Sequence, residues 1–226
     1  MKRSRINDIL REGEAFIRSF GYVLPPFARW TPEELAARRP AGILEARLGW
    51  DITDYGKGRF DELGLLLFTV RNGRAADLAR GTGMLYAEKI MISRRNQLSP
   101  MHRHVVKAED IINRGGGKLV LELFMKAADG SIDRSADVEV PTDGLTHRLP
   151  AGGLLKLDPG ESVTLLPGVW HAFWGEGGDV LIGEVSTVND DLADNVFADP
   201  IDRFSSIEED EPPLRLLVSD YDRWFG

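Results

Sequence analysis

The sequence contains no cysteine, so neither a disulfide nor a thiolate metal ligand is available to this chain. Any metal site must be built from imidazole and carboxylate groups, and a cysteine-free chain suits the cytoplasm. Basic residues are also outnumbered, at 28 against 36 acidic ones, which gives a formal net charge of −8. Proteins that bind the phosphate backbone normally carry an excess of positive charge, so no nucleic acid partner is expected.

Long apolar runs are missing as well. Residues 1–20 carry charges throughout and lack the unbroken apolar stretch of a signal peptide. Nowhere do the roughly 18 consecutive apolar residues of a membrane-spanning helix occur. We therefore expect a cytoplasmic protein without a membrane partner. A chain of 226 residues is long enough to fold as one large domain with a substantial core.

Two helices are predicted near the N-terminus. Residues 4–20 place apolar side chains at roughly helical spacing, with Ser4 as the expected N-cap and Gly21 as the expected stop. A second helix is predicted to begin at Thr31, because its hydroxyl can cap a helix that opens with Pro32 and two acidic residues. Residues 1–50 are therefore expected to form a helical extension.

From residue 63 onward the pattern changes to short apolar runs rich in β-branched and aromatic residues, separated by clusters of Gly, Asn, Asp and Pro. Many short strands at this spacing predict a β-sandwich or barrel. The predicted strands are 64–71, 87–93, 118–125, 137–140, 154–157, 162–165, 172–174, 180–187 and 214–218. We expect a single domain over residues 1–226, with the barrel core at 63–226 and the helical extension packed on it.

Histidine is scarce, with four in the whole chain, yet His102 and His104 are separated by a single residue. Alternation along a strand puts both imidazoles on one face, close enough to bind the same ion. Glu109 follows five residues later and offers a hard oxygen ligand, before a turn predicted at the glycines 115–117. His171 is a third candidate ligand further along the chain. The fourth histidine, in a polar stretch at position 147, is expected to be structural or solvated.

The pattern His-x-His, four residues, Glu and a glycine-rich turn resembles the first cupin motif, and the segment from Gly160 to His171 resembles the second. The chain departs from the motifs in two places. Asn96 stands where the first motif usually opens with Gly, and Pro167 directly precedes Gly168, where the family often has a residue between them. Asn tolerates a left-handed backbone, so the first turn can be kept. The resemblance implies an all-β, jelly-roll-like cupin barrel with N-terminal α-helices.

A wider resemblance runs nearly end to end. Six stretches are similar to the D-lyxose ketol-isomerase family: 24–28, 48–54, 86–91, 109–117, 183–191 and 208–210. The resemblance implies a manganese-dependent cupin, usually a homodimer, that interconverts D-lyxose with D-xylulose and often also D-mannose with D-fructose. It also implies metal ligation by His102, His104, Glu109 and His171, the four residues that spacing selects.

Aldose–ketose isomerisation moves a proton between adjacent carbons through an enediolate, whose developing charge a divalent ion stabilises as a Lewis acid. Three neutral imidazoles and one carboxylate suit a hard, oxygen-seeking ion such as Mn²⁺. Fe²⁺, Co²⁺ or Zn²⁺ would bind the same ligands, so the choice of manganese depends on the resemblance.

Lys89 and Glu184 are the candidate catalytic residues, because each is an ionisable residue within an otherwise apolar predicted strand. Such side chains are rarely buried unless they are paired. We expect Lys89 to contact substrate oxygens and Glu184 to act as general acid and base. The alternatives are a strand-edge lysine and a glutamate that orients a ligand histidine. Glu109 could also exchange a proton with the substrate in addition to binding metal.

Five further residues are candidates for substrate binding. Lys107 is expected to reach the mouth of the cavity, with a surface position as the alternative. Asp190 and Asp191 follow the Glu184 strand and are expected to bind sugar hydroxyls, unless they only turn the chain. Trp170 and Phe173 flank His171, and aromatic faces often pack on the apolar C–H face of sugars, although aromatic residues in such a strand are also typical of a core.

Three other functions suit the same motifs: an Fe(II)-dependent cupin dioxygenase, a sugar-phosphate isomerase and a non-catalytic sugar-binding cupin. Arg114 and Arg203 could anchor an anionic substrate, but no glycine-rich phosphate loop followed by a helix is evident. An unphosphorylated monosaccharide is therefore the expected substrate. The acidic run 208–211 is expected to be a solvated turn.

Overall fold

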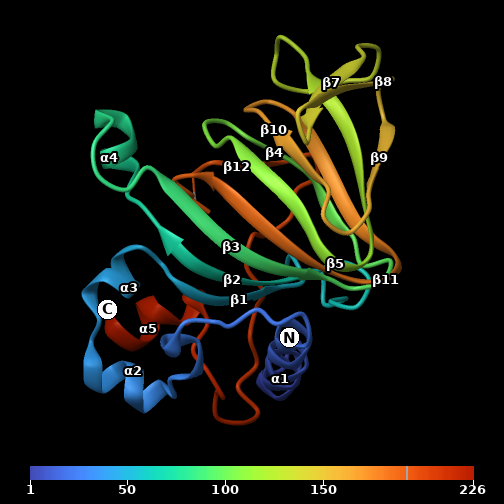
Figure 1. Ribbon diagram of the computed structural model, residues 1–226. Helices are drawn as coiled ribbons and strands as arrows, with labels where there is room; N and C mark the ends of the chain where they lie inside the picture. Colours follow the sequence, from blue (N-terminus) through green and yellow to red (C-terminus); the bar gives the residue numbers. More distant parts are fainter. Residues whose placement is uncertain (192) are drawn as a thin grey trace.

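The computed structural model describes residues 1–191 and 193–226, and its centre is a curled antiparallel sheet (Figure 1). Neighbouring strands follow the order β1-β2-β3-β11-β4-β12, and β5 extends the sheet by pairing with β11, β10, β9 and β6, while β7 and β8 form a separate hairpin. The strands are β1 (Gly49–Thr53), β2 (Leu65–Asn72), β3 (Tyr86–Ser93), β4 (Ser99–His104), β5 (Glu109–Lys126), β6 (Ile132–Asp133), β7 (Val138–Thr142), β8 (Leu145–Leu149), β9 (Gly153–Leu157), β10 (Ser162–Leu165), β11 (Trp170–Thr187) and β12 (Asn195–Phe197). The predicted mainly β fold with N-terminal helices is confirmed.

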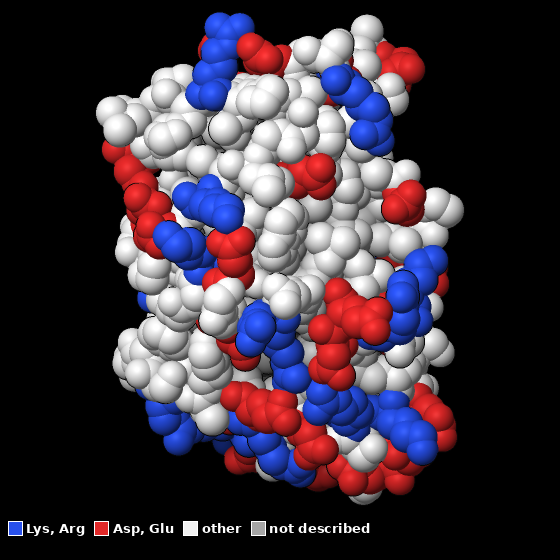
Figure 2. All heavy atoms as spheres, turned by 90° about the vertical axis from the view of Figure 1, so that its right-hand side faces the viewer, with Lys and Arg blue, Asp and Glu red and all other residues white. Residues whose placement is uncertain are grey.

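Helices cover the outer face of β1, β2 and β3, at the bottom of Figure 1. They are α1 (Arg3–Ser19), η1 (Pro26–Arg29), α2 (Pro32–Arg38), α3 (Ala41–Glu45), η2 (Val218–Asp220) and α5 (Tyr221–Phe225), while α4 (Ala75–Arg80) projects from the β2–β3 connection. On the face seen in Figure 2, positive and negative side chains are interspersed and lie most densely at the helical end. Among the described residues, no helix is long and apolar enough to span a bilayer.

Strand β2 is buried on both faces, and its alternate residues enter two different cores. Leu65 and Leu67 point into the barrel, whereas Leu66 and Phe68 pack outward under α1. Strand β3 follows the same alternation, with Met91 in the inner core and its neighbours in the outer one. Successive side chains of a strand point to opposite faces, so the inward face of β3 also carries Lys89.

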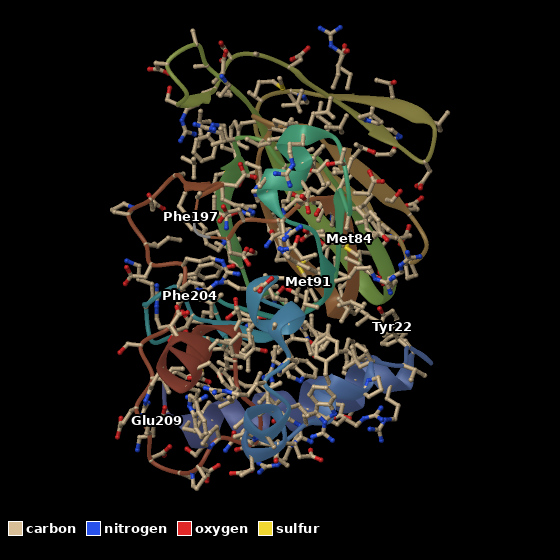
Figure 3. The ribbon with its side chains drawn as sticks, turned by 90° about the vertical axis from the view of Figure 1, so that its left-hand side faces the viewer. Tyr22, Met84, Met91, Phe197, Phe204 and Glu209 are labelled. Carbon is tan, nitrogen blue, oxygen red and sulfur yellow. The ribbon has the colours of Figure 1, made fainter. Side chains whose placement is uncertain are left out.

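Both predicted helices are present, but the predicted cap at the start of the first is wrong. Thr31 caps α2 through a complete capping box, and Gly21 follows α1 with a left-handed φ of 75°. Ser4 is not the N-cap of α1, because the helix begins at Arg3 and the amide and hydroxyl of Ser4 both donate to Asp210. The acidic run 208–211 is exposed as predicted, but it also holds α1 through Asp210 and through Glu209, which is labelled in Figure 3.

Three strand predictions need correction. The glycines at 115–117 do not end a strand, because β5 continues through Gly115 and Gly116 at φ values of 146° and 99°, with shifts of register against β11. The predicted strands 172–174 and 180–187 likewise continue into each other through shifts of register and form one long strand, β11. The segment 214–218 is not a strand and makes one isolated bridge, from Leu217 to Trp50, while β1, which starts at Gly49, was not predicted.

Candidate metal centre

A cavity lies inside the curled sheet, lined by side chains from β2, β3, β4, β5, β11 and β12 and from four connecting segments, which carry Tyr55, Lys107, Asp191 and Arg203. It brings together nine residues that the sequence analysis selects: Lys89, His102, His104, Lys107, Glu109, His171, Phe173, Glu184 and Asp191. Met91 and Phe197, labelled in Figure 3, contribute apolar surface. The wall also includes Arg203, which the sequence analysis considers as an anchor for an anionic substrate, and Tyr55, which no motif predicts because tertiary packing brings its loop to the barrel.

The three histidines meet because β4 and β11 are paired, with His171 opposite His102. The ring Nδ1 of His102 lies 2.8 Å from the carbonyl oxygen of Pro100, and Nδ1 of His171 lies 3.1 Å from that of Val169. These bonds place the proton on Nδ1 and leave Nε2 of both rings able to bind a metal. One ligand nitrogen from each of these two rings and from His104 lies within 4.8 Å of the others.

Glu109 completes this cluster. Its Oε1 lies 3.3 Å from Nε2 of both His104 and His171, yet this buried oxygen has no hydrogen-bond partner among the described residues. A buried polar atom without a partner is unfavourable, and a shared cation would satisfy it together with the two nitrogens. In the described part of the chain, Nδ1 of His104 also lacks a hydrogen-bond partner. The donor set fits a divalent metal ion.

The protonation states of these groups also suit a cation. Burial, followed by the neighbouring imidazoles, lowers the pKa of His102 well below its usual range, and burial lowers that of His104. Burial alone would raise the pKa of Glu109, but the charge of Lys107 and the nearby imidazole of His104 hold it well below its usual range. Neutral imidazoles beside an ionised carboxylate are the forms that bind metal.

Two lysines flank a second buried carboxylate in the same cavity. Nζ of Lys107 lies 2.7 Å from Oε2 of Glu109 and 2.9 Å from Oε1 of Glu184, and Nζ of Lys89 lies 3.5 Å from the same Glu184 oxygen. Burial opposes ionisation of Glu184, but the charges of Lys107 and Lys89 lower its pKa. Lys107 is therefore a buried bridge between two carboxylates and does not lie at a surface position.

Arg203 forms a further part of the wall. Its Nη2 lies 2.8 Å from Oδ2 of Asp51 and 3.3 Å from Oδ1 of Asp191. Nη1 of Arg203 and Oδ1 of Asp51 are buried and have no hydrogen-bond partner among the described residues. Burial raises the pKa of Asp51 despite Arg203, whereas the charges of Lys89 and Arg203 outweigh burial and lower that of Asp191. Of these two atoms, only Nη1 of Arg203 belongs to a side chain in the described lining of the cavity.

Three of the selected residues lie elsewhere. Trp170 precedes His171 on β11 and points to the other face, where its indole N–H donates to the carbonyl of Ser131. Asp190 lines two surface pockets and is absent from the described lining of the cavity. His147 is exposed on β8, as predicted.

The fold and the site together define a cupin-type barrel with a three-histidine centre for a divalent ion. Solved L-ribose isomerases share the fold. That of Cellulomonas parahominis aligns at a TM-score of 0.56 and 16% identity, and that of Acinetobacter sp. DL28 at 0.58 and 15%, each over 92% of this chain and 98% of the other.

The D-lyxose isomerase family model matches residues 1–221. Proteins named D-lyxose/D-mannose isomerase are 46% identical to this chain: that of Serratia proteamaculans over the whole of both chains, and that of Escherichia coli O157:H7 over 98% of both. The chain belongs to the D-lyxose isomerase family and is a sugar isomerase. The family resemblance predicted from the sequence is confirmed.

Proposed function

We propose that this protein interconverts D-lyxose with D-xylulose and D-mannose with D-fructose, with the help of a divalent metal ion. The observation that carries the proposal is the buried Glu184 carboxylate, flanked by Lys89 and Lys107 in the cavity that holds the three histidines. Support for these sugars comes from relatives named D-lyxose/D-mannose isomerase at 46% identity.

In this proposal His102, His104, His171 and Glu109 hold the ion. When bound, it supplies Lewis-acid polarisation of the substrate's carbonyl and hydroxyl oxygens. We propose Mn²⁺ on the basis of the family resemblance, and the set of imidazoles and one carboxylate is compatible with it. Fe²⁺, Co²⁺ and Zn²⁺ are the alternatives for the same ligands.

Glu184 is the proposed base. Its carboxylate is ionised, so it can accept the proton from C2 of the aldose and return it to C1, while the proton of the C2 hydroxyl passes to O1, and the two transfers together yield the ketose. Lys107 keeps this carboxylate ionised, and Lys89 donates a hydrogen bond to a substrate oxygen. Glu109 is better suited to ligation than to proton transfer, because Oε2 is held by Lys107 at 2.7 Å and Oε1 faces two ligand nitrogens.

The rest of the cavity suits an uncharged sugar. Each Lys or Arg side chain in the described lining has a carboxylate oxygen within 3.5 Å, so little positive charge is left for a phosphate. We propose that Asp191 and the open Nη1 of Arg203 bind sugar hydroxyls and that Phe173 contacts the C–H face. Trp170 and Asp190 are proposed to support the strand and the loop from outside the cavity.

We further propose a single domain over residues 1–226, because α1 and the outer face of the sheet share one core. One cooperative unfolding transition would support that proposal. The homodimer and the cytoplasmic location implied by the resemblance are also proposals. Light scattering during gel filtration tests the first, and cell fractionation tests the second.

The direct test is to incubate the purified protein and Mn²⁺ with D-lyxose or D-mannose and to follow the sugars by ¹³C NMR. Formation of D-xylulose and D-fructose supports the proposal, and formation of neither would refute it. An oxygen electrode in the same reaction gives a second reading, because an isomerase consumes no O₂ whereas a dioxygenase does.

A further inference from the structure

Lys89 is held by a neutral partner, although two carboxylates lie nearby. Its Nζ donates a hydrogen bond of 2.6 Å to Oδ1 of Asn189, while Glu184 and Asp191 stand further off, at 3.5 and 3.7 Å. Attraction between unlike charges is strong in a buried site, and a lysine side chain is long and flexible. A further contact must therefore hold the Lys89 ammonium group at the side-chain amide of Asn189 and prevent it from moving to hydrogen-bond distance of Glu184.

Asn189 is in turn fixed by Asn72, at the end of β2. The backbone N–H of Asn189 donates to Oδ1 of Asn72, and Nδ2 of Asn72 donates to the backbone carbonyl of Asn189, both at 2.9 Å. The second Nδ2 proton is directed to the carbonyl of Ala46 at 3.3 Å. The Asn72 amide thus pairs with the backbone of Asn189 as a neighbouring strand would, and both of its N–H groups are used.

The backbone around Asn72 is shaped for this pairing. A Cβ on the next residue, Gly73, would lie 1.9 Å from the carbonyl oxygen of Met84 and 2.8 Å from Cγ2 of Val188. Only glycine allows the end of β2 to approach the segment that carries Asn189 so closely. Asn72 and Asn189 line a surface pocket beside the cavity, and Asp191 borders both spaces.

We infer that Asn72 is a positioning residue for the isomerase: it fixes Asn189, and Asn189 holds the ammonium group of Lys89 off the Glu184 carboxylate. The inference rests on the proposed function, because it assumes that Glu184 moves the proton. Oε1 of Glu184 already accepts a hydrogen bond from Nζ of Lys107 at 2.9 Å, so a second ammonium group bonded to it would also occupy its remaining acceptor position, the one that receives the proton. The neutral side-chain amide of Asn189 keeps Lys89 from taking that position and leaves its ammonium group available to the substrate.

Asn72→Ala tests this inference, with Asn7→Ala as the matched control. Asn7 also makes three side-chain hydrogen bonds, to Glu211, Pro212 and Leu214, but it lies on α1, far from the cavity lining. We expect Asn72→Ala to lower kcat on D-lyxose by about ten- to a hundredfold, since small misplacements of reacting groups have effects of this size. KM and metal content should change little, and Asn7→Ala should keep kcat.

A double-mutant cycle separates positioning from general loosening of the fold. In an Asn189→Leu background, which already lacks the amide acceptor, Asn72→Ala should lower kcat no further. An unchanged kcat in Asn72→Ala, or equal losses in both backgrounds, would overturn the inference.

Crystal structures of the Asn72→Ala protein provide a readout that needs no turnover. Nζ of Lys89 should leave Asn189 and move from 3.5 Å to hydrogen-bond distance of Glu184. Lys89 still bonded to Asn189 would overturn the positioning role. A wild-type protein that converts neither D-lyxose nor D-mannose would instead refute the proposed function, and the crystal structure would still decide how Lys89 is held.

Discussion

Nζ of Lys107 lies 2.9 Å from Oε1 of Glu184, and the same ammonium group lies 2.7 Å from Oε2 of Glu109. One buried cation therefore serves both the proposed base and the proposed metal ligand. All three side chains are nearly inaccessible to solvent, so their charges interact with little screening. In the proposed mechanism this one lysine links metal binding to proton transfer.

Replacement of this lysine by methionine removes the charge while keeping an apolar chain of similar length. Lys107→Met leaves two buried carboxylates without their cation, which typically destabilises a protein by about 3–5 kcal/mol. We expect kcat to fall by at least about a hundredfold, because Glu184 would be partly protonated. The free energy of unfolding in urea and kcat on D-lyxose are the measurements. The control is the exposed Lys118, which is paired with Asp158, and Lys118→Met should leave the free energy of unfolding and kcat nearly unchanged. Equal behaviour of the two variants would contradict the role assigned to Lys107.

Glu184→Gln keeps the shape of the proposed base but removes its ability to accept a proton. We expect turnover to fall by about 10²- to 10⁴-fold while the protein retains its metal, because Glu184 is not among the proposed ligands. Metal content by mass spectrometry and kcat are measured on the same sample. Glu176→Gln, on the same strand but exposed and paired with Lys156, should be fully active. Turnover retained in Glu184→Gln would exclude it as the base.

Removal of one imidazole should have a different signature. We expect His102→Ala to lose bound metal and turnover together, since its ring is one of three that converge within 4.8 Å. His147→Ala is the matched control, because His147 is exposed on β8. Full metal content in dialysed His102→Ala protein would remove His102 from the ligand set.

A fourth prediction concerns stability at the helical end. The fully buried Arg3 donates to both Glu209 and Asp220. We expect Arg3→Met to lower the free energy of unfolding by about 3 kcal/mol at pH 7, because it leaves Asp220 buried without its cation. Arg11→Met, which breaks an exposed pair with Asp8, should change it by less than about 1 kcal/mol.

The pair of Arg3 and Glu209 makes the stability of the fold depend on pH, and the sign of this dependence can be predicted. The hydrogen bond from Arg3 lowers the pKa of Glu209 in the folded protein and outweighs the opposing effect of burial. Glu209 therefore stabilises the fold above its unfolded pKa of about 4.3, and this contribution is lost as the pH falls through the lower folded pKa. Urea unfolding between pH 6 and 3 should show a steeper loss for wild type than for Arg3→Met. Parallel curves would contradict the pairing.

Local patterns explain why much of the site could be predicted. The alternation of β3 and β11 directs Lys89 and Glu184 inward, and the His-x-His spacing places two rings on one face of β4. Asn96 adopts the left-handed φ of 59° that the turn requires, so the departure from the cupin motif preserves the backbone. In each case the residue and its immediate neighbours in the sequence are enough to predict the direction of the side chain or the conformation of the backbone.

The remainder depends on contacts between distant segments. Arg203 and Asn189 enter the site from irregular segments, and no periodicity reports where such segments pack. The apolar run at 214–218 was predicted to be a strand, but Leu216 and Val218 are buried against the C-terminal helix instead. Trp170 was assigned to the sugar because of its neighbour His171, although alternation along one strand separates the two side chains.

The most direct test of the central claim is to strip the protein with a chelator and reload separate samples with Mn²⁺, Fe²⁺, Co²⁺ or Zn²⁺ before assaying D-lyxose and D-mannose. We predict that ketose formation vanishes on stripping and returns on reloading, most strongly with Mn²⁺. Full turnover by protein shown to be metal-free would contradict a metal-dependent isomerase.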